Sequence, residues 1–269
     1  MSDYVLSMLD PFDTNITQPK ILDGSVDRSC GIKLKASGTF QLDATGADTY
    51  FILYPGYTYC GNWKSTAGVP SLHAFFPNHL ETTTNRANVK QIRLVSCGAL
   101  FSLENSNDEN EGFWEAVRIP LDYANFTLVD SSAPNGEDYA ARIIQTFAIS
   151  DMSNYQTYQT GKLRDIDRFL FKLNSVAPDH PFKRVLPSST PPAVTDVLDD
   201  FFDCVIIKMK GRVDAVTPST IRYQIVSNQE VVYQENTQLS RLMLYNEMLP
   251  DMDQLLNKTR FMLPAVQVK

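Results

Sequence analysis

The sequence predicts an all-β fold, either a sandwich or a jelly roll, with one or two short helices in its loops. Three observations support this fold class. Strand-like runs bounded by Gly, Pro, Asn and Asp are frequent, helical periodicity is rare, and no repeat of fixed period is present. Many short strands with few helices are typical of two sheets packed around one core.

The first predicted strand spans residues 30–42. Ile32 and Leu34 alternate there with Lys33 and Lys35, which is the pattern of a strand with one buried face. The two lysines should therefore project from the face opposite the core.

Residues 89–103 predict a long strand whose apolar phase changes part-way. Ile92 and Leu94 share one phase, and the apolar positions from Val95 onward take the other. Such a change predicts a β-bulge or burial of both faces.

Four more segments have strand character, and one has helical character. The strands are expected at 49–57, 112–121, 203–212 and 220–234. Residues 135–150 are the best helix candidate, because apolar side chains recur there at helical spacing and Glu137 and Asp138 favour its N-terminus.

Composition and charge exclude several classes of protein. The 269 residues carry a net charge of −7 and contain no run of basic residues, which argues against a broad nucleic-acid-binding surface. No apolar stretch approaches the roughly 18 residues of a membrane helix, and no signal-peptide pattern opens the chain, so no membrane partner is expected.

The cysteines and histidines predict no metal site. The cysteines are far apart and form no CxxC pair, which favours buried free thiols over disulfides: Cys30, Cys60, Cys97 and Cys204. The histidines lack the spacing of a metal site and are interpreted as loop packing: His73, His79 and His180.

No catalytic motif is present either. The chain has no G-x-S-x-G elbow, no phosphate loop and no G-x-G-x-x-G motif. Residues 104–111 are rich in Asp, Glu and Asn but lack the central glycine of a calcium loop, so a solvated connection between strands is expected. We therefore expect no catalytic residue, no cofactor and no metal, and a protein that is not an enzyme.

Four segments resemble the capsid proteins of single-stranded DNA viruses with circular, Rep-encoding genomes. The most specific is "VKQIRLVSCGALFSLENSNDENEGFWEAVRIP" at 89–120, where an apolar strand leads through acidic residues to Gly-aromatic-aromatic-Glu-Ala. The others are "TGKLRDIDRFLFKLN" at 160–174, the strand pair at 202–235, and "YVLSMLDPF" at 4–12, which is similar to the arm-to-shell lead-in of nodavirus-like capsids. Within the group, the chain looks like a bacilladnavirus-type capsid protein with a nodavirus-like jelly roll.

The resemblance implies a fold, a function and a location. It implies one antiparallel eight-stranded jelly-roll sandwich of the viral capsid type, which self-assembles in many copies into an icosahedral shell around single-stranded DNA. We expect an N-terminal arm at 1–24, the shell domain at 25–245 and a C-terminal arm at 246–269, with both arms ordered by neighbouring subunits. The protein would be a virion component, assembled inside the host cell and facing a host surface receptor.

The family usually has an Arg/Lys-rich arm that neutralises the genome, and this chain departs from that pattern at its start. We expect a basic N-terminal extension before Met1, so that packaged viral DNA contacts an arm not present here. Any DNA contact within the chain is predicted at Lys20, Arg28, Lys33 and Lys35. For Lys33 and Lys35 a solvated strand face or an inter-subunit salt bridge is the alternative.

A jelly-roll carbohydrate-binding module, similar to a lectin, is the alternative function. It would use acidic loop residues beside Trp63 or Trp114 as an aromatic platform. Because Trp114 follows Phe113 in a strand, at least one of those two rings should lie in the core.

Overall fold

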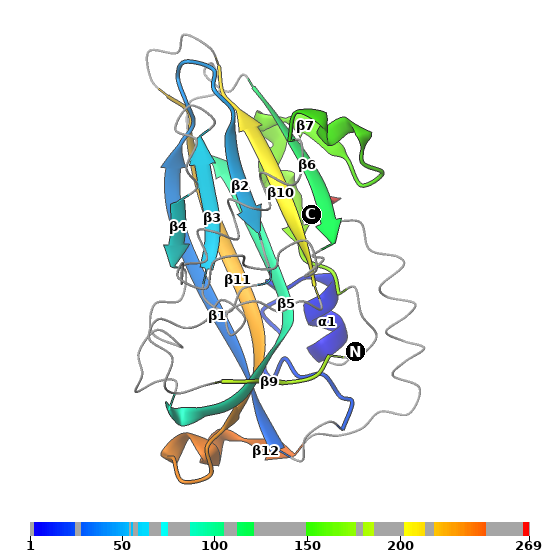
Figure 1. The fold of residues 1–269 in the computed structure, drawn as a ribbon, viewed down its shortest axis with the longest axis vertical. Helices are drawn as coiled ribbons and strands as arrows, with labels where there is room; N and C mark the ends of the chain where they lie inside the picture. The colour runs from blue at the N-terminus through cyan, green and yellow to red at the C-terminus, as the bar shows by residue number, and fades with distance from the viewer. Residues whose placement is uncertain are drawn as a thin grey trace, which may run out of the picture.

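The computed structural model describes residues 3–24, 28–53, 55, 59–64, 71–74, 87–104, 112–120, 149–175, 180–185, 202–212, 218–245 and 266–268. Two antiparallel sheets face each other across one core (Figure 1). The first sheet has the strand order β12-β1-β11-β5-β8-β13, with β9 beside β5. Its strands are β1 (Arg28–Gln41), β5 (Val89–Leu103), β8 (Phe169–Lys172), β9 (Lys183–Arg184), β11 (Thr220–Tyr233), β12 (Leu244–Tyr245) and β13 (Val266–Val268).

The second sheet has the order β4-β3-β2-β10-β6-β7. Its strands are β2 (Thr49–Leu53), β3 (Tyr59–Lys64), β4 (Ser71–Ala74), β6 (Phe113–Pro120), β7 (Gln159–Lys162) and β10 (Asp203–Lys210). The described helices are α1 (Asp3–Leu9) and three short 3₁₀ helices: η2 (Ile149–Asn154), η3 (Leu163–Arg168) and η5 (Gln238–Leu242).

Eight of the strands form the predicted jelly roll. The rows β1-β11-β5-β8 and β2-β10-β6-β7 lie in opposite sheets, and the chain changes sheet from β1 to β2, from β5 to β6, from β7 to β8 and from β10 to β11. The other strands extend the sheets at their edges, except β9, which pairs with β5. All six strands expected from sequence are present, with ends that differ by a few residues.

Aromatic side chains fill the space between the sheets. Phe101 lies edge-on to Phe51 at 5.0 Å and to Phe171 at 5.4 Å between ring centroids. Trp114 is 1% exposed and packs against Phe171, whereas Phe113 is 40% exposed. The prediction that at least one of these two neighbouring rings lies in the core is therefore confirmed.

The phase change in β5 comes from a bulge at Val95. Asn228 of β11 faces Ser96 while the next residue, Gln229, faces Leu94, so Val95 is an extra residue in β5. Leu94 packs in the main core, and Val95 packs in a second apolar cluster on the other side of the sheet. Both predicted explanations hold together: β5 has a bulge and is buried on both faces.

Several predictions concern residues outside the described part of the chain. They are the helix at 135–150 for its first fourteen residues, the acidic loop from 105 to 111, and the side chains of Cys60, His73 and His79. The other three cysteines are buried free thiols, as expected: Cys30, Cys97 and Cys204. β5 and β6 lie in different sheets, so the acidic stretch joins the two sheets.

Candidate nucleic-acid interface and N-terminal strap

Residues 3–24, here called the N-terminal strap, cover the face of the first sheet that points away from the core. α1 packs on β5 (Figure 1). Tyr4, Val5 and Met8 form the second apolar cluster with Ile21 and Val95. Burial of these side chains on their own sheet stabilises the strap by removing apolar area from water, at about 25 cal/mol per Å².

Polar side chains of the sheet hold the strap through its backbone. Their donor groups follow the strap in order: Lys172 Nζ of β8 to the Met8 carbonyl (2.8 Å), Asn228 Nδ2 of β11 to the Pro11 carbonyl (3.1 Å) and Lys33 Nζ of β1 to the Asp13 carbonyl (2.5 Å). The strap thus crosses the sheet from β8 to β1. Each bond satisfies a backbone carbonyl that the close packing would otherwise shield from water.

The strap then returns across the same sheet over Gly31. A Cβ atom at Gly31 would lie 2.6 Å from the backbone nitrogen of Pro19, a distance that real side chains do not tolerate. Gln18 accepts a hydrogen bond from the Gly31 amide at 3.1 Å. Glycine at this position therefore permits the close approach of strap and strand.

Arg93 is the centre of a buried polar network at the end of the strap. Its guanidinium, 0% exposed, pairs with Glu230 at 2.7 Å and with Asp23 at 2.6 Å. It also donates to the carbonyl oxygens of Ile21 and His180, at 2.9 Å each. Burial alone would lower the pKa of Arg93, but the hydrogen bonds and charges of Asp23 and Glu230 outweigh it and raise that pKa. The network fixes the strap, β5 and β11 to one another.

Two more buried ionisable groups lie in the first and second sheets. Burial, with the nearby charge of Arg118, lowers the pKa of Lys172 to about 8. Burial raises the pKa of Asp203 to about 7, although Arg118, whose Nε lies 2.6 Å away, opposes this shift. Lys172 joins β8 to the strap, whereas Asp203 joins β10 to β6 through Arg118. Asp203 also accepts a hydrogen bond from the Asn174 amide at 2.7 Å.

The four basic residues predicted to contact DNA fall into two pairs. Lys20 and Arg28 meet at β12, where Lys20 donates to the Leu244 carbonyl (2.9 Å) and Arg28 to the Met243 carbonyl (3.0 Å). Lys20 is 5% exposed, and burial lowers its pKa. Arg28 is exposed.

The second pair lies on β1, on the face opposite its core-packed residues, as the alternation predicted. Lys33 is half-buried against the strap, and burial together with the charge of Lys35 lowers its pKa. Lys35 is exposed. Of the four predicted residues, Arg28 and Lys35 are therefore the most accessible to a ligand.

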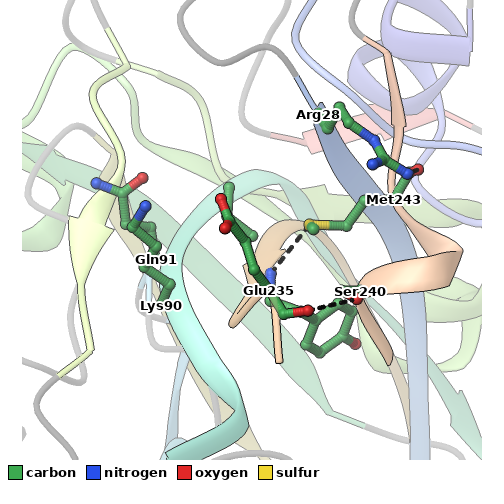
Figure 2. Close-up of a pocket in the computed structure, with 8 residues that line it drawn as sticks. Arg28, Lys90, Gln91, Glu235, Ser240 and Met243 are labelled. Atoms are coloured by element: carbon green, nitrogen blue, oxygen red, sulfur yellow. Dashed lines mark hydrogen bonds between the residues drawn. The ribbon is translucent and has the colours of Figure 1, made fainter. Parts of the chain in front are cut away.

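A pocket of about 520 Å³ opens where β1, β5, β11 and η5 meet (Figure 2). Arg28, Lys90 and Glu235 line it together with Gln91 and Ser240. Lys90 and Gln91 lie on one side of it and Arg28 on the other, with Glu235 between them (Figure 2). The pocket therefore presents charged groups from segments far apart in the sequence.

The described residues offer no arrangement suited to metal binding. No group of three or more His, Cys, Asp or Glu side chains lies together in the part of the chain that the structure describes. His180 is buried, contacts the Ser175 hydroxyl through Nε2 and lies edge-on to Phe202. This is a packing position, as predicted for that histidine. None of the helices among the described residues is long and apolar enough to cross a membrane.

Several functional residues were missed from sequence. They are the buried polar side chains that hold the strap: Arg93, Lys172, Asn228 and Glu230. The available signal was a polar residue inside an apolar strand, as with Arg93 in "QIRLV". That signal shows that a partner is needed, but the two acidic partners of Arg93, Asp23 and Glu230, lie 70 and 137 residues away.

Comparison with known protein families decides the identity of the chain. The model of the Shotokuvirus capsid protein family matches residues 2–192 and 188–262. The chain belongs to this family. It is a structural coat protein and a virion component that assembles with copies of itself.

Two relatives of this coat protein are capsid proteins of other viruses. The capsid protein of Chaetoceros diatodnavirus 1 is 28% identical, over 84% of this chain and 72% of the relative. The capsid protein of Avon-Heathcote Estuary associated kieseladnavirus is also 28% identical, over 87% of this chain and 79% of that relative. These matches confirm the resemblance to the capsid proteins of single-stranded DNA viruses.

Solved structures confirm the jelly-roll fold of the coat protein. T=1 particles derived from infectious bursal disease virus contain a chain with a TM-score of 0.61, 9% identity, and coverage of 99% of this chain and 93% of that one. A chain of the T13 particle of the same virus has a TM-score of 0.60 and 10% identity, with coverage of 98% of this chain and 92% of that one. The carbohydrate-binding alternative gains no support. Of its two candidate rings, Trp114 is buried, and the side chain of Trp63 lies outside the described part of the chain.

The N-terminal segment departs from its expected position. Residues 1–24 were expected outside the main body, but residues 3–24 lie on the first sheet of their own subunit. The physical reason is that the sheet presents buried donors and an apolar cluster that the strap satisfies. The division of the chain at residues 24 and 245 stays a prediction.

Proposed function

We propose that this coat protein assembles as an icosahedral shell that encloses a single-stranded DNA genome. The family match across residues 2–262 carries the proposal, because it spans the jelly roll and the strap together. The role is structural and involves no catalysis. Exposed loops of the shell would meet a host surface receptor.

The icosahedral geometry is supported by the fold. Structures with the same jelly roll come from T=1 particles and from a T13 particle described as icosahedral. A jelly roll suits this use, since its two packed sheets form a rigid domain whose ends and edges remain available for contacts with neighbouring subunits.

The DNA content is supported by the resemblance to single-stranded DNA virus capsids and by the exposed cations Arg28 and Lys35. Phosphate contacts by such cations would add a salt-dependent attraction between shell and genome. Lys20 and Lys33 would contribute through their charge, since both already hold the strap or β12.

Expression of the full chain tests the proposal. We expect size-exclusion chromatography and negative-stain microscopy to show closed particles of many tens of subunits. Particles treated with nuclease and then opened should release DNA that deoxyribonuclease degrades. A monomer at every concentration and salt would contradict the shell, and particles that protect no DNA when produced in virus-infected cells would contradict the genome assignment.

A further inference from the structure

Cationic residues from four distant segments lie at one end of the first sheet. Arg28 and Lys90 line the pocket of Figure 2, together with Ser240 of η5. Arg184 of β9 faces Gln91, which also lines this pocket. We call this group the basic end; its members are Arg28, Lys90, Lys183, Arg184 and Arg241.

Among the described residues that build the basic end, cations outnumber acids. The segments that build it, at 28–29, 88–92, 180–185 and 231–245, contain one carboxylate, Glu235. Two acids of the adjoining network, Asp23 and Glu230, are bound by Arg93. In a chain of net charge −7, this end is a local concentration of positive charge that attracts polyanions.

The basic end is accessible. Arg28, Lys90, Arg184 and Arg241 are exposed, and Lys183 is half-buried. The pocket volume of about 520 Å³ falls within the ~300–1,000 Å³ usual for ligand sites. Because Glu235 lies between Lys90 and Arg28, its carboxylate would repel an entering phosphate (Figure 2).

An exposed aromatic side chain lies beside these cations. Tyr245 of β12 is 77% exposed, and the Arg28 guanidinium lies 5.5 Å from its ring centroid. Sites for single-stranded nucleic acid combine a cationic track with aromatic rings on which bases stack. This pairing favours single-stranded nucleic acid over an isolated anion.

We propose that the basic end binds the phosphate backbone of single-stranded nucleic acid, with Tyr245 stacking on a base. The inference rests on the proposed function, because it names residues through which the shell would hold its genome. The proposed contact with nucleic acid lies at a site that forms only in the folded protein. Of the four residues predicted from sequence to contact DNA, it includes only Arg28.

Binding of fluorescent oligo-dT by the full chain tests this site, measured by anisotropy from 20 to 200 mM salt. The variant Lys90→Gln, Arg184→Gln, Arg241→Gln leaves the Arg28 hydrogen bond to Met243 in place. We expect it to lose at least tenfold in affinity at the lowest salt, and its log–log salt slope to become shallower by about 2, because each phosphate contact contributes about 0.7. Tyr245→Ala should weaken binding at all salt concentrations, whereas Glu235→Gln should strengthen it.

The matched control is Lys162→Gln, Arg164→Gln, Arg168→Gln, which removes three exposed cations elsewhere. Equal losses in the control and test variants would overturn the site, as would unchanged binding by the test variant. No oligo-dT binding by the wild-type chain at 20 mM salt would overturn it as well.

Particle formation, followed in parallel by microscopy, separates this inference from the proposed function. Oligo-dT binding that depends on the basic end, in a chain that forms no particles, would support the site and contradict the shell. A test variant that keeps its oligo-dT affinity but no longer forms particles would instead make the basic end a contact between subunits, which contradicts the inference.

Discussion

The ammonium group of Lys172 on β8 donates a hydrogen bond of 2.8 Å to the carbonyl oxygen of Met8, 164 residues away in the chain. The side chain is 1% exposed, and its pKa is lowered to about 8 from an ordinary value of 10.5. A buried cation thus holds the strap on the sheet, and its charge is costly in the folded state.

This cost predicts a pH dependence of stability. Between pH 8 and 10 the unfolded chain binds more protons at Lys172 than the folded protein does, so the free energy of unfolding should rise with pH. For this one group the rise is about 2–3 kcal/mol. Urea unfolding of wild type and Lys172→Met from pH 7 to 10 measures it, because all other groups titrate in both proteins. A stability difference that stays constant across this range would refute the prediction; Lys162→Met, at an exposed site, is the control.

The Arg93–Glu230 pair predicts a strongly non-additive pair of substitutions. Arg93→Met should lower the free energy of unfolding by about 3–5 kcal/mol, because it leaves the fully buried Glu230 carboxylate without its cation. Adding Glu230→Leu removes that stranded charge, so the double variant should lose less than the sum of the two single variants. A double-mutant cycle from urea unfolding gives the coupling. Additive losses would mean that the two side chains act independently.

Gly31 predicts how the strap can be loosened without altering a charge. Gly31→Ala would place a methyl group 2.6 Å from the Pro19 nitrogen, so strap or strand must move. We expect a loss of about 1–3 kcal/mol, as for other overpacked sites. Proteases should also cleave faster within residues 3–24, as mass spectrometry would show. Ser37→Ala, at an exposed position of the same strand, should change neither property. Equal cleavage of all three proteins would disprove the close contact.

The sheets could be predicted from sequence because their strands carry a local signal. Ile32 and Leu34 alternate with lysines over a 14-residue strand, and the change of phase at Val95 marked a bulge that the register confirms. β7 and β8 were not predicted as strands, since four residues are too few for a period of two to stand out.

The strap and the basic end could not be predicted in the same way. The sequence shows that the apolar residues of α1 must be buried against another surface. It does not show whether that surface belongs to their own sheet or to a neighbouring subunit. Arg28 and Lys90 are isolated cations in the sequence, and Arg184 has only Lys183 beside it. Only the pairing of β9 with β5 and the pocket shared by Arg28 and Lys90 show that these residues lie at the same end of the sheet. Contacts between distant segments leave no periodic pattern in the sequence, so they become visible only in the folded structure.

Substitutions of Lys33 and Lys35 on β1 should have different effects on stability, because Lys33 contacts the strap and Lys35 is exposed. Lys33 donates to the Asp13 carbonyl, so Lys33→Met should loosen the strap and lower the free energy of unfolding by about 1–2 kcal/mol. Lys35 is exposed, so Lys35→Gln should leave stability within about 0.5 kcal/mol. If Lys35 touches the genome, that variant should also make the salt slope of oligo-dT binding shallower by about 0.7. Urea unfolding and anisotropy on the same preparations measure both effects. An unchanged slope for Lys35→Gln would remove Lys35 as a phosphate contact, and unchanged stability for Lys33→Met would show that the strap does not depend on this bond.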